Sequence, residues 1–204
     1  MLFCEYPYLD YLFPYFLLNL LSMEHNPWTI NAEKLVYENP WIQVSEFAVT
    51  TPSGKDGIYG KVHFKNIAVG VVVLDEEMHT WLVGQYRFPL QQYSWEIPEG
   101  GAPEGTDPLL SAYRELKEET GFTAQSWQHL LTMHLSNSVS DELALVYLAT
   151  DLKAGEWEPE DTEQLQLKRV PVHEAFAMVA NGAITDAISV AALLKLQVWL
   201  QQPK

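Results

Sequence analysis

The chain has 204 residues, of which 48% are hydrophobic and 12% aromatic, so one compact core is expected and a disordered or fibrous protein is excluded. The formal net charge of −15 repels nucleic acid and anionic lipid, so neither is expected as a partner. An anionic substrate would need local cations or a bound metal. The single cysteine, Cys4, excludes an internal disulfide and a cysteine-rich zinc site, and a cytoplasmic protein is expected.

Residues 1–22 are apolar and aromatic, but they lack the pattern of a targeting segment. A secretory signal begins with basic residues, and the first cationic side chain here is Lys34. A membrane helix needs about 20 unbroken apolar residues, whereas this stretch contains Glu5, Asp10 and two prolines. We therefore predict a mis-called start, with translation beginning at Met23, and assign this apolar extension no function.

The chain after this extension begins with the pattern of β-strands. A turn-rich segment at residues 51–57 indicates a hairpin, and residues 67–74 form a continuous β-branched run that is typical of a strand buried on both faces. The predicted strands cover residues 35–49 with a turn at Asn39–Pro40, then 58–64, 67–74 and 80–86. We divide this part into N-terminal strands at residues 23–66 and a main domain at residues 67–204.

The second half combines helices with further strands. Residues 100–107 form a predicted Gly/Pro loop, after which Asp107 caps a helix that starts with Pro108 and ends at Gly121. Strands are expected at residues 127–134, 143–148 and 165–170, an acidic loop at 151–163, and helices at 171–180 and 186–201. This order predicts an α/β protein of the α+β type, with a mixed sheet covered by helices.

The predicted helix before Gly121 carries an acidic stripe, formed by Glu115, Glu118 and Glu119. Like charges at this spacing destabilise a helix by roughly 0.2 to 0.5 kcal/mol per pair, and carboxylates near a helix C-terminus oppose the helix dipole. A divalent cation bound to the stripe would reverse both penalties. The spacing alone leaves a solvated acidic face as an equal alternative.

Residues 100–122 resemble the Nudix hydrolase signature, G-x5-E-x7-R-E-U-x-E-E-x-G-U, in which U is a bulky apolar residue. The matching residues are Gly100, Arg114, Glu115, Leu116, Glu118, Glu119, Gly121 and Phe122. Thr106 stands where the family has its first glutamate, so the number of metals is open. The resemblance implies an α/β/α sandwich with an N-terminal β-rich extension.

The resemblance also implies a metal site and its ligands. In the family this helix holds magnesium or manganese on the substrate diphosphate, which assigns Glu115 and Glu119 as ligands, Glu118 as the third, and the backbone carbonyl of Glu99 as a further one. Arg114 matches an arginine that orients a ligand carboxylate. Its alternative role is a simple ion pair on the helix face.

Beyond the signature, the chain resembles the ADP-ribose and nucleoside-diphosphate-sugar pyrophosphatases. The shared segments are residues 39–41, 51–55, 85–87 and 95–100. This resemblance implies a nucleotide-sugar substrate, cleaved to a nucleoside monophosphate and a sugar phosphate, and a homodimer whose N-terminal strands cross to the partner. Trp41 and Tyr59 align with aromatics that stack on the base, and Arg87 with an arginine on the phosphates. The alternative for Trp41 and Tyr59 is ordinary packing of strand residues. The alternative for Arg87 is a salt bridge at the end of a strand.

The general base of this subgroup lies on a later loop, and residues 136–142 resemble that loop. Glu142 is therefore the candidate base, with Glu118 as the next choice and a solvated loop carboxylate as the alternative. Two other functions compete with the enzyme. One is a Nudix-fold sensor that binds nucleotide sugars without turnover, and the other is an acidic interaction domain with an apolar docking segment.

Overall fold

The computed structural model describes residues 25–155 and 165–202. The apolar extension at residues 1–22 and most of the predicted acidic loop lie outside these ranges. The chain forms two compact units, each described by itself. One comprises the described residues up to Lys34 together with Glu46–Tyr59, and the other comprises Leu35–Ser45 and the described residues from Gly60 onward. The proposed division between residues 66 and 67 stays a prediction.

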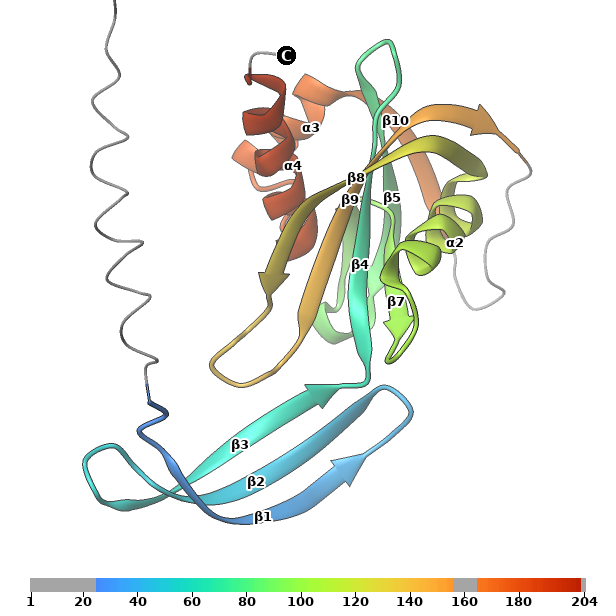
Figure 1. The fold of residues 1–204 in the computed structure, drawn as a ribbon. Coiled ribbons are helices and arrows are strands. Elements are labelled where there is room, and N and C mark those ends of the chain that lie inside the picture. Colours follow the sequence, from blue (N-terminus) through green and yellow to red (C-terminus); the bar gives the residue numbers. More distant parts are fainter. Residues whose placement is uncertain (1–24, 156–164, 203–204) are drawn as a thin grey trace, which may run out of the picture. The chain divides into compact units, whose positions relative to one another are not determined.

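The N-terminal strands are β1 (Thr29–Glu38), β2 (Ile42–Thr50) and β3 (Asp56–Phe64), in the sheet order β1-β2-β3 (Figure 1). The predicted turn at Asn39–Pro40 is confirmed, because the Asn39 side chain accepts hydrogen bonds from the backbone N–H groups of Trp41 and Ile42, both at 2.8 Å. The predicted hairpin is confirmed as well, since Gly54 adopts a φ of +78° and its N–H donates to the Thr51 carbonyl at 2.8 Å.

The remaining strands form two sheets. Their bounds are β4 (Asn66–Val73), β5 (His79–Arg87), β6 (Gln92–Glu96), β7 (Glu99–Pro103), β8 (Phe122–His134), β9 (Leu143–Ala154) and β10 (Gln166–Pro171). The sheet orders are β10-β5-β6 and β7-β4-β9-β8. Strand β4 runs parallel to β9 and antiparallel to β7, so the predicted mixed sheet is confirmed.

The described helices are α2 (Pro108–Thr120), α3 (Val172–Ala180), α4 (Ala187–Leu200) and a 3₁₀ turn at Phe88–Leu90. Both predicted ends of α2 are confirmed. The Asp107 carboxylate accepts a hydrogen bond from Leu109 N at 3.0 Å, and Gly121 takes a φ of +72° at the C-terminus. Within residues 25–155 and 165–202, no helix has the length and apolar character that crossing a membrane requires.

The core has two parts, one on each face of β4. Val69, Val71 and Val73 pack in one cluster with Ala112 and Leu116 of α2. Val72 points to the opposite face, where its cluster includes residues of α3 and α4. Figure 1 shows α2 on one side of these strands and α3 with α4 on the other. The predicted doubly buried strand and the α/β/α sandwich are both confirmed.

Several elements differ from the sequence prediction, and the first strand, β1, already begins at Thr29 instead of residue 35. The loop predicted at residues 100–107 is wrong in its first part, because Glu99–Pro103 forms β7 and pairs with β4. Strand β6 was not predicted, β8 already begins at Phe122, and β9 continues to Ala154, into the segment predicted as an acidic loop. Each of these segments is polar or glycine-rich, so its composition does not indicate a strand. Each becomes a strand because it pairs with a neighbouring strand.

Candidate active site

The site forms where the chain passes from one sheet to the other. Glu96 is the last residue of β6 and Glu99 is the first residue of β7. The link between them is fixed at both residues, since Ile97 N donates to Ser189 Oγ at 2.9 Å and Val71 N donates to the Pro98 carbonyl at 2.8 Å. The sheet topology therefore holds two carboxylates close together.

Helix α2 adds two buried carboxylates from its inner face. Glu115 and Glu119 are one helical turn apart, and only 8% and 2% of their surfaces are exposed. Glu119 Oε2 accepts a hydrogen bond from Glu99 N at 2.9 Å. A Cβ atom at Gly100 would overlap the Glu115 carboxylate, so any larger residue there would have to displace this carboxylate.

Two arginines lie against these carboxylates. Arg87 Nη2 lies 2.5 Å from both Glu96 Oε2 and Glu99 Oε1.

Arg114 Nη2 lies 2.6 Å from Glu115 Oε1, and its Nη1 lies 2.6 Å from Glu118 Oε2. Arg114 also donates to the Gly101 carbonyl at 3.3 Å, which ties α2 to β7. The ion pairs considered as alternatives for both arginines are therefore present.

Two further carboxylates belong to the same region. A carboxylate oxygen of Asp186, the residue before α4, lies within 4.8 Å of oxygens of Glu96 and Glu99. Burial, followed by the charge of Asp186, raises the pKa of Glu142. The charge of Asp186 thus acts on the ionisation of Glu142.

The loop that carries Glu142 is bound to β3. Val62 N donates to the Val139 carbonyl at 2.8 Å, and Asp141 N donates to the Val62 carbonyl at 3.2 Å. The Asp141 side chain accepts a hydrogen bond from Phe64 N at 3.1 Å and lies 2.9 Å from His63 Nδ1. The loop at residues 136–142 is therefore anchored to β3.

Comparison with known proteins agrees with this geometry. The sequence model of the NUDIX domain matches residues 64–193, a span that includes every carboxylate named above. The chain belongs to the NUDIX domain family. It is 33% identical over 175 residues to an ADP-ribose pyrophosphatase of Mycobacterium tuberculosis, covering 84% of this chain and 83% of the relative.

Other relatives and a solved structure extend the comparison. The Nudix chain is 31% identical over 181 residues to the CMP-5'-(N-acetyl-N-hydroxy-3-aminopropyl)phosphonate hydrolase of Streptomyces rubellomurinus, covering 86% of each protein. It is 32% identical over 133 residues to an ADP-ribose pyrophosphatase of Bacillus subtilis, covering 64% of this chain and 72% of the relative. The crystal structure of an ADP compounds hydrolase shares the fold, with a TM-score of 0.78 at 23% identity over 88% of this chain and 97% of that one.

The Nudix site has more negative charge than its arginines compensate. Burial first, and then the charges of Asp186 and Glu96, raise the pKa of Glu99 well above its usual value, although Arg87 opposes them. Glu99 Oε2 is buried and has no hydrogen-bond partner. Buried carboxylate oxygens in excess of nearby cations are the donor set that magnesium and manganese prefer. The residues present therefore fit the divalent metal of the Nudix family.

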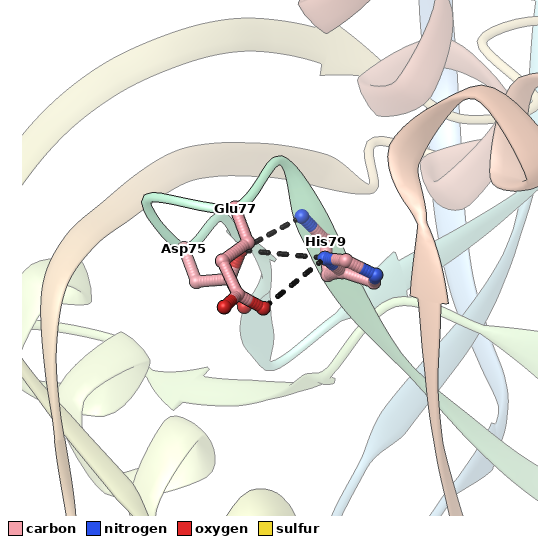
Figure 2. Close-up of side chains that lie close together, drawn as sticks. All are labelled: Asp75, Glu77 and His79. Carbon is pink, nitrogen blue, oxygen red and sulfur yellow. Dashed lines mark hydrogen bonds and ion pairs between the residues drawn. The ribbon is translucent and has the colours of Figure 1, made fainter.

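A second group of possible ligands lies in the turn between β4 and β5. Figure 2 shows the side chain of His79 facing Asp75 and Glu77. Its Nδ1 atom lies 3.8 Å from Asp75 Oδ1 and 4.0 Å from Glu77 Oε2. Arg169 Nη2 already binds both carboxylates, at 2.5 Å from Asp75 and 2.6 Å from Glu77. Its guanidinium compensates the charge of these two carboxylates.

The two predicted base-stacking residues lie in different compact units. Trp41 is 65% exposed and directly precedes β2, while Tyr59 in β3 makes an edge-to-face contact with Trp28, with ring centroids 5.4 Å apart. Both rings present aromatic surface, but these contacts do not test whether they bind a base. Their role stays a prediction.

Sequence reasoning missed Glu96 and Asp186. Glu96 lies in the shared segment at residues 95–100, where the resemblance gives it no role, and Asp186 is the first residue of the helix predicted at residues 186–201. Thr106, at the position of the missing glutamate, donates its hydroxyl to the Pro103 carbonyl at 2.6 Å. It thus closes the turn before α2 and supplies no carboxylate there.

Proposed function

We propose that the protein hydrolyses the diphosphate bond of ADP-ribose or a related nucleoside diphosphate sugar, giving a nucleoside monophosphate and a sugar phosphate. The observation that carries this proposal is the convergence of Glu96, Glu99, Glu115 and Glu119 at one place in a Nudix chain. The relatives named ADP-ribose pyrophosphatases support the substrate class. The single cysteine supports a reducing compartment, and we propose the cytoplasm.

We propose that residues of α2 and of β7 bind the metal. We assign magnesium or manganese to Glu115 and Glu119, with Glu118 as a third ligand and Glu99 as a contributor from β7. When bound, the cation neutralises phosphate charge and lowers the pKa of a water molecule. Arg114 holds Glu115 and Glu118 through separate nitrogens of one guanidinium, which fixes the orientation of both carboxylates.

Arg87 is the proposed phosphate-binding residue. Its side chain is 34% exposed although it contacts Glu96 and Glu99. A guanidinium carries five donors in a planar fork, so it can hold carboxylates on one edge and a phosphate on another. Hydrogen bonding with Glu96 and the charges of Glu99 and Glu96 outweigh the effect of burial and raise the pKa of Arg87, so it stays cationic.

Glu142 is the proposed general base. Its raised pKa makes the ionised carboxylate a better proton acceptor than an ordinary glutamate. It would take a proton from the attacking water while the other phosphate leaves in line. The hydrogen bonds between its loop and β3 fix the position from which it acts.

A substrate panel tests the activity. We expect the protein to release AMP from ADP-ribose, or a nucleoside monophosphate from another nucleoside diphosphate sugar, when magnesium is present and not when it is chelated. Phosphate release by an added phosphatase, which acts on the products and not on the diphosphate, measures the rate. Tight binding of a nucleotide sugar without turnover would instead support the sensor.

We also propose a homodimer formed through β1, β2 and β3. All ten residues of β1 are exposed, and Ile30, Leu35, Val36 and Tyr37 among them are large and apolar. Trp41 and Tyr59 of these strands would then stack on the base across the dimer, where stacking contributes about 1 to 3 kcal/mol per base.

Light scattering at micromolar concentration is expected to give the mass of a dimer. Val36→Asp should shift the protein to a monomer, because a charge would replace apolar contact area. Val198→Asp on α4 is the matched control, since Val198 is 54% exposed and Val36 is 57% exposed. A monomeric wild-type protein would refute the proposal.

A further inference from the structure

The first turn of α4 is fixed against the segment that links Glu96 to Glu99. Ser189 is fully buried, and its Oγ accepts the hydrogen bond from Ile97 N at 2.9 Å. On the same turn, Ile188 lies so close to β4 that a Cβ atom at Gly70 would come within 2.9 Å of its Cγ2 atom. The start of α4 therefore has little freedom to move relative to the carboxylates.

This docking fixes Asp186. One of its oxygens, Oδ2, accepts a hydrogen bond from Ser189 N at 2.7 Å and caps the helix. The carboxylate also lies within 4.8 Å of the oxygens of Glu96 and Glu99. Asp186 thus connects the end of a helix with the acidic site, from a position far outside the Nudix signature in the sequence.

Capping alone does not require a negative charge at this position. Asparagine and serine cap helices about as well as aspartate. Glu96 is 2% exposed, and Glu99 Oε2 is buried without a hydrogen-bond partner, so a third carboxylate adds repulsion in a place that is poorly solvated. Arg87 contacts Glu96 and Glu99 together and leaves this excess charge in place.

We propose that Asp186 is a further metal-binding carboxylate, which α4 contributes to the group formed with Glu96 and Glu99. The inference rests on the proposed function in so far as that function requires a divalent cation. It adds to the ligands of α2 a residue from a different helix. The affinity for the cation then depends on how α4 docks on the segment between β6 and β7.

The test is manganese binding in the absence of substrate, followed by the paramagnetic resonance signal of free Mn²⁺. Asp186→Asn keeps an oxygen that can accept from Ser189 N but removes the charge. We expect it to weaken Mn²⁺ binding by about tenfold or more, the range found when groups around a metal site are altered. The increase in Tm on adding Mn²⁺ should shrink in parallel.

Asp107→Asn is the matched control. Asp107 caps α2 in the same way, through Leu109 N at 3.0 Å, and it is not among the carboxylates assigned to the metal. We expect it to bind Mn²⁺ like the wild type. Should Asp186→Asn fail to fold by circular dichroism, Asp186→Ser provides a second uncharged cap.

Manganese affinity of Asp186→Asn equal to that of the wild type would overturn the inference, as would a wild-type protein that binds no Mn²⁺. The inference and the proposed function can fail separately. If Asp186→Asn binds Mn²⁺ as tightly as the wild type and the wild type hydrolyses nucleotide sugars, only the metal-binding role of Asp186 is refuted. If Asp186→Asn binds Mn²⁺ more weakly but the wild type hydrolyses no nucleotide sugar, only the proposed activity is refuted.

Discussion

Replacing Glu119 with glutamine is expected to lower kcat/KM for the nucleotide sugar by orders of magnitude while the fold stays intact. Glutamine has nearly the same helix propensity, and its amide oxygen can still accept the hydrogen bond from Glu99 N. What is lost is the charge of a residue that is almost fully buried next to Glu99 and that we assign to the metal. Turnover at saturating magnesium measures the effect, with circular dichroism as the check on folding.

Glu174→Gln is the control for this prediction. Glu174 lies on α3 and forms an exposed ion pair with Lys168 at 3.6 Å, so the same substitution there should leave turnover unchanged. Near wild-type turnover of Glu119→Gln at saturating magnesium would contradict the assignment of the metal to α2.

The second large effect is expected at Glu142. Loss of a general base lowers the rate by about 10² to 10⁴-fold, whereas loss of a solvated loop carboxylate has no effect. Glu142→Gln should therefore reduce kcat with little change in magnesium affinity, while Glu115→Gln should weaken magnesium binding as well. Steady-state kinetics combined with calorimetry separates the two variants.

The pH dependence adds an independent test of the same residue. A base works only when ionised, and burial and Asp186 raise the pKa of Glu142. The rate should therefore decline as the pH falls through this raised pKa, at a higher pH than an ordinary glutamate would give. In Glu142→Gln this decline of the rate at low pH should be absent. If the variant keeps more than about a third of the wild-type kcat, far outside the range for a general base, the base is elsewhere and Glu118 is next.

The parts of the structure that depend on local chemistry could be predicted from the sequence. The ends of α2 follow from Asp107, Pro108 and Gly121, because caps act within one turn. The burial of β4 on both faces follows from its unbroken β-branched run. The shared face of Glu115 and Glu119 follows from helical periodicity.

The other half of the acidic site could not be predicted in this way. Of Glu96 and Glu99 the resemblance indicates only the backbone carbonyl of Glu99, whereas their side chains meet where the chain passes from β6 to β7, two strands of different sheets that their own residues do not predict. Asp186 joins them through the contact between Ser189 and Ile97, which lie far apart in the sequence. Such pairings are set by the packing of the whole domain, and no local pattern records them.

The attachment of residues 136–142 to β3 bears on where the functional unit begins. A protein trimmed to the family match at residues 64–193 would keep Glu142 and every other carboxylate of the site. It would lose Val62, which exchanges backbone hydrogen bonds with Val139 and Asp141, and His63, which lies against the Asp141 carboxylate. The smallest piece that holds Glu142, the proposed base, in this way therefore extends into β3, so this strand has a part in the site besides its proposed part in dimer formation.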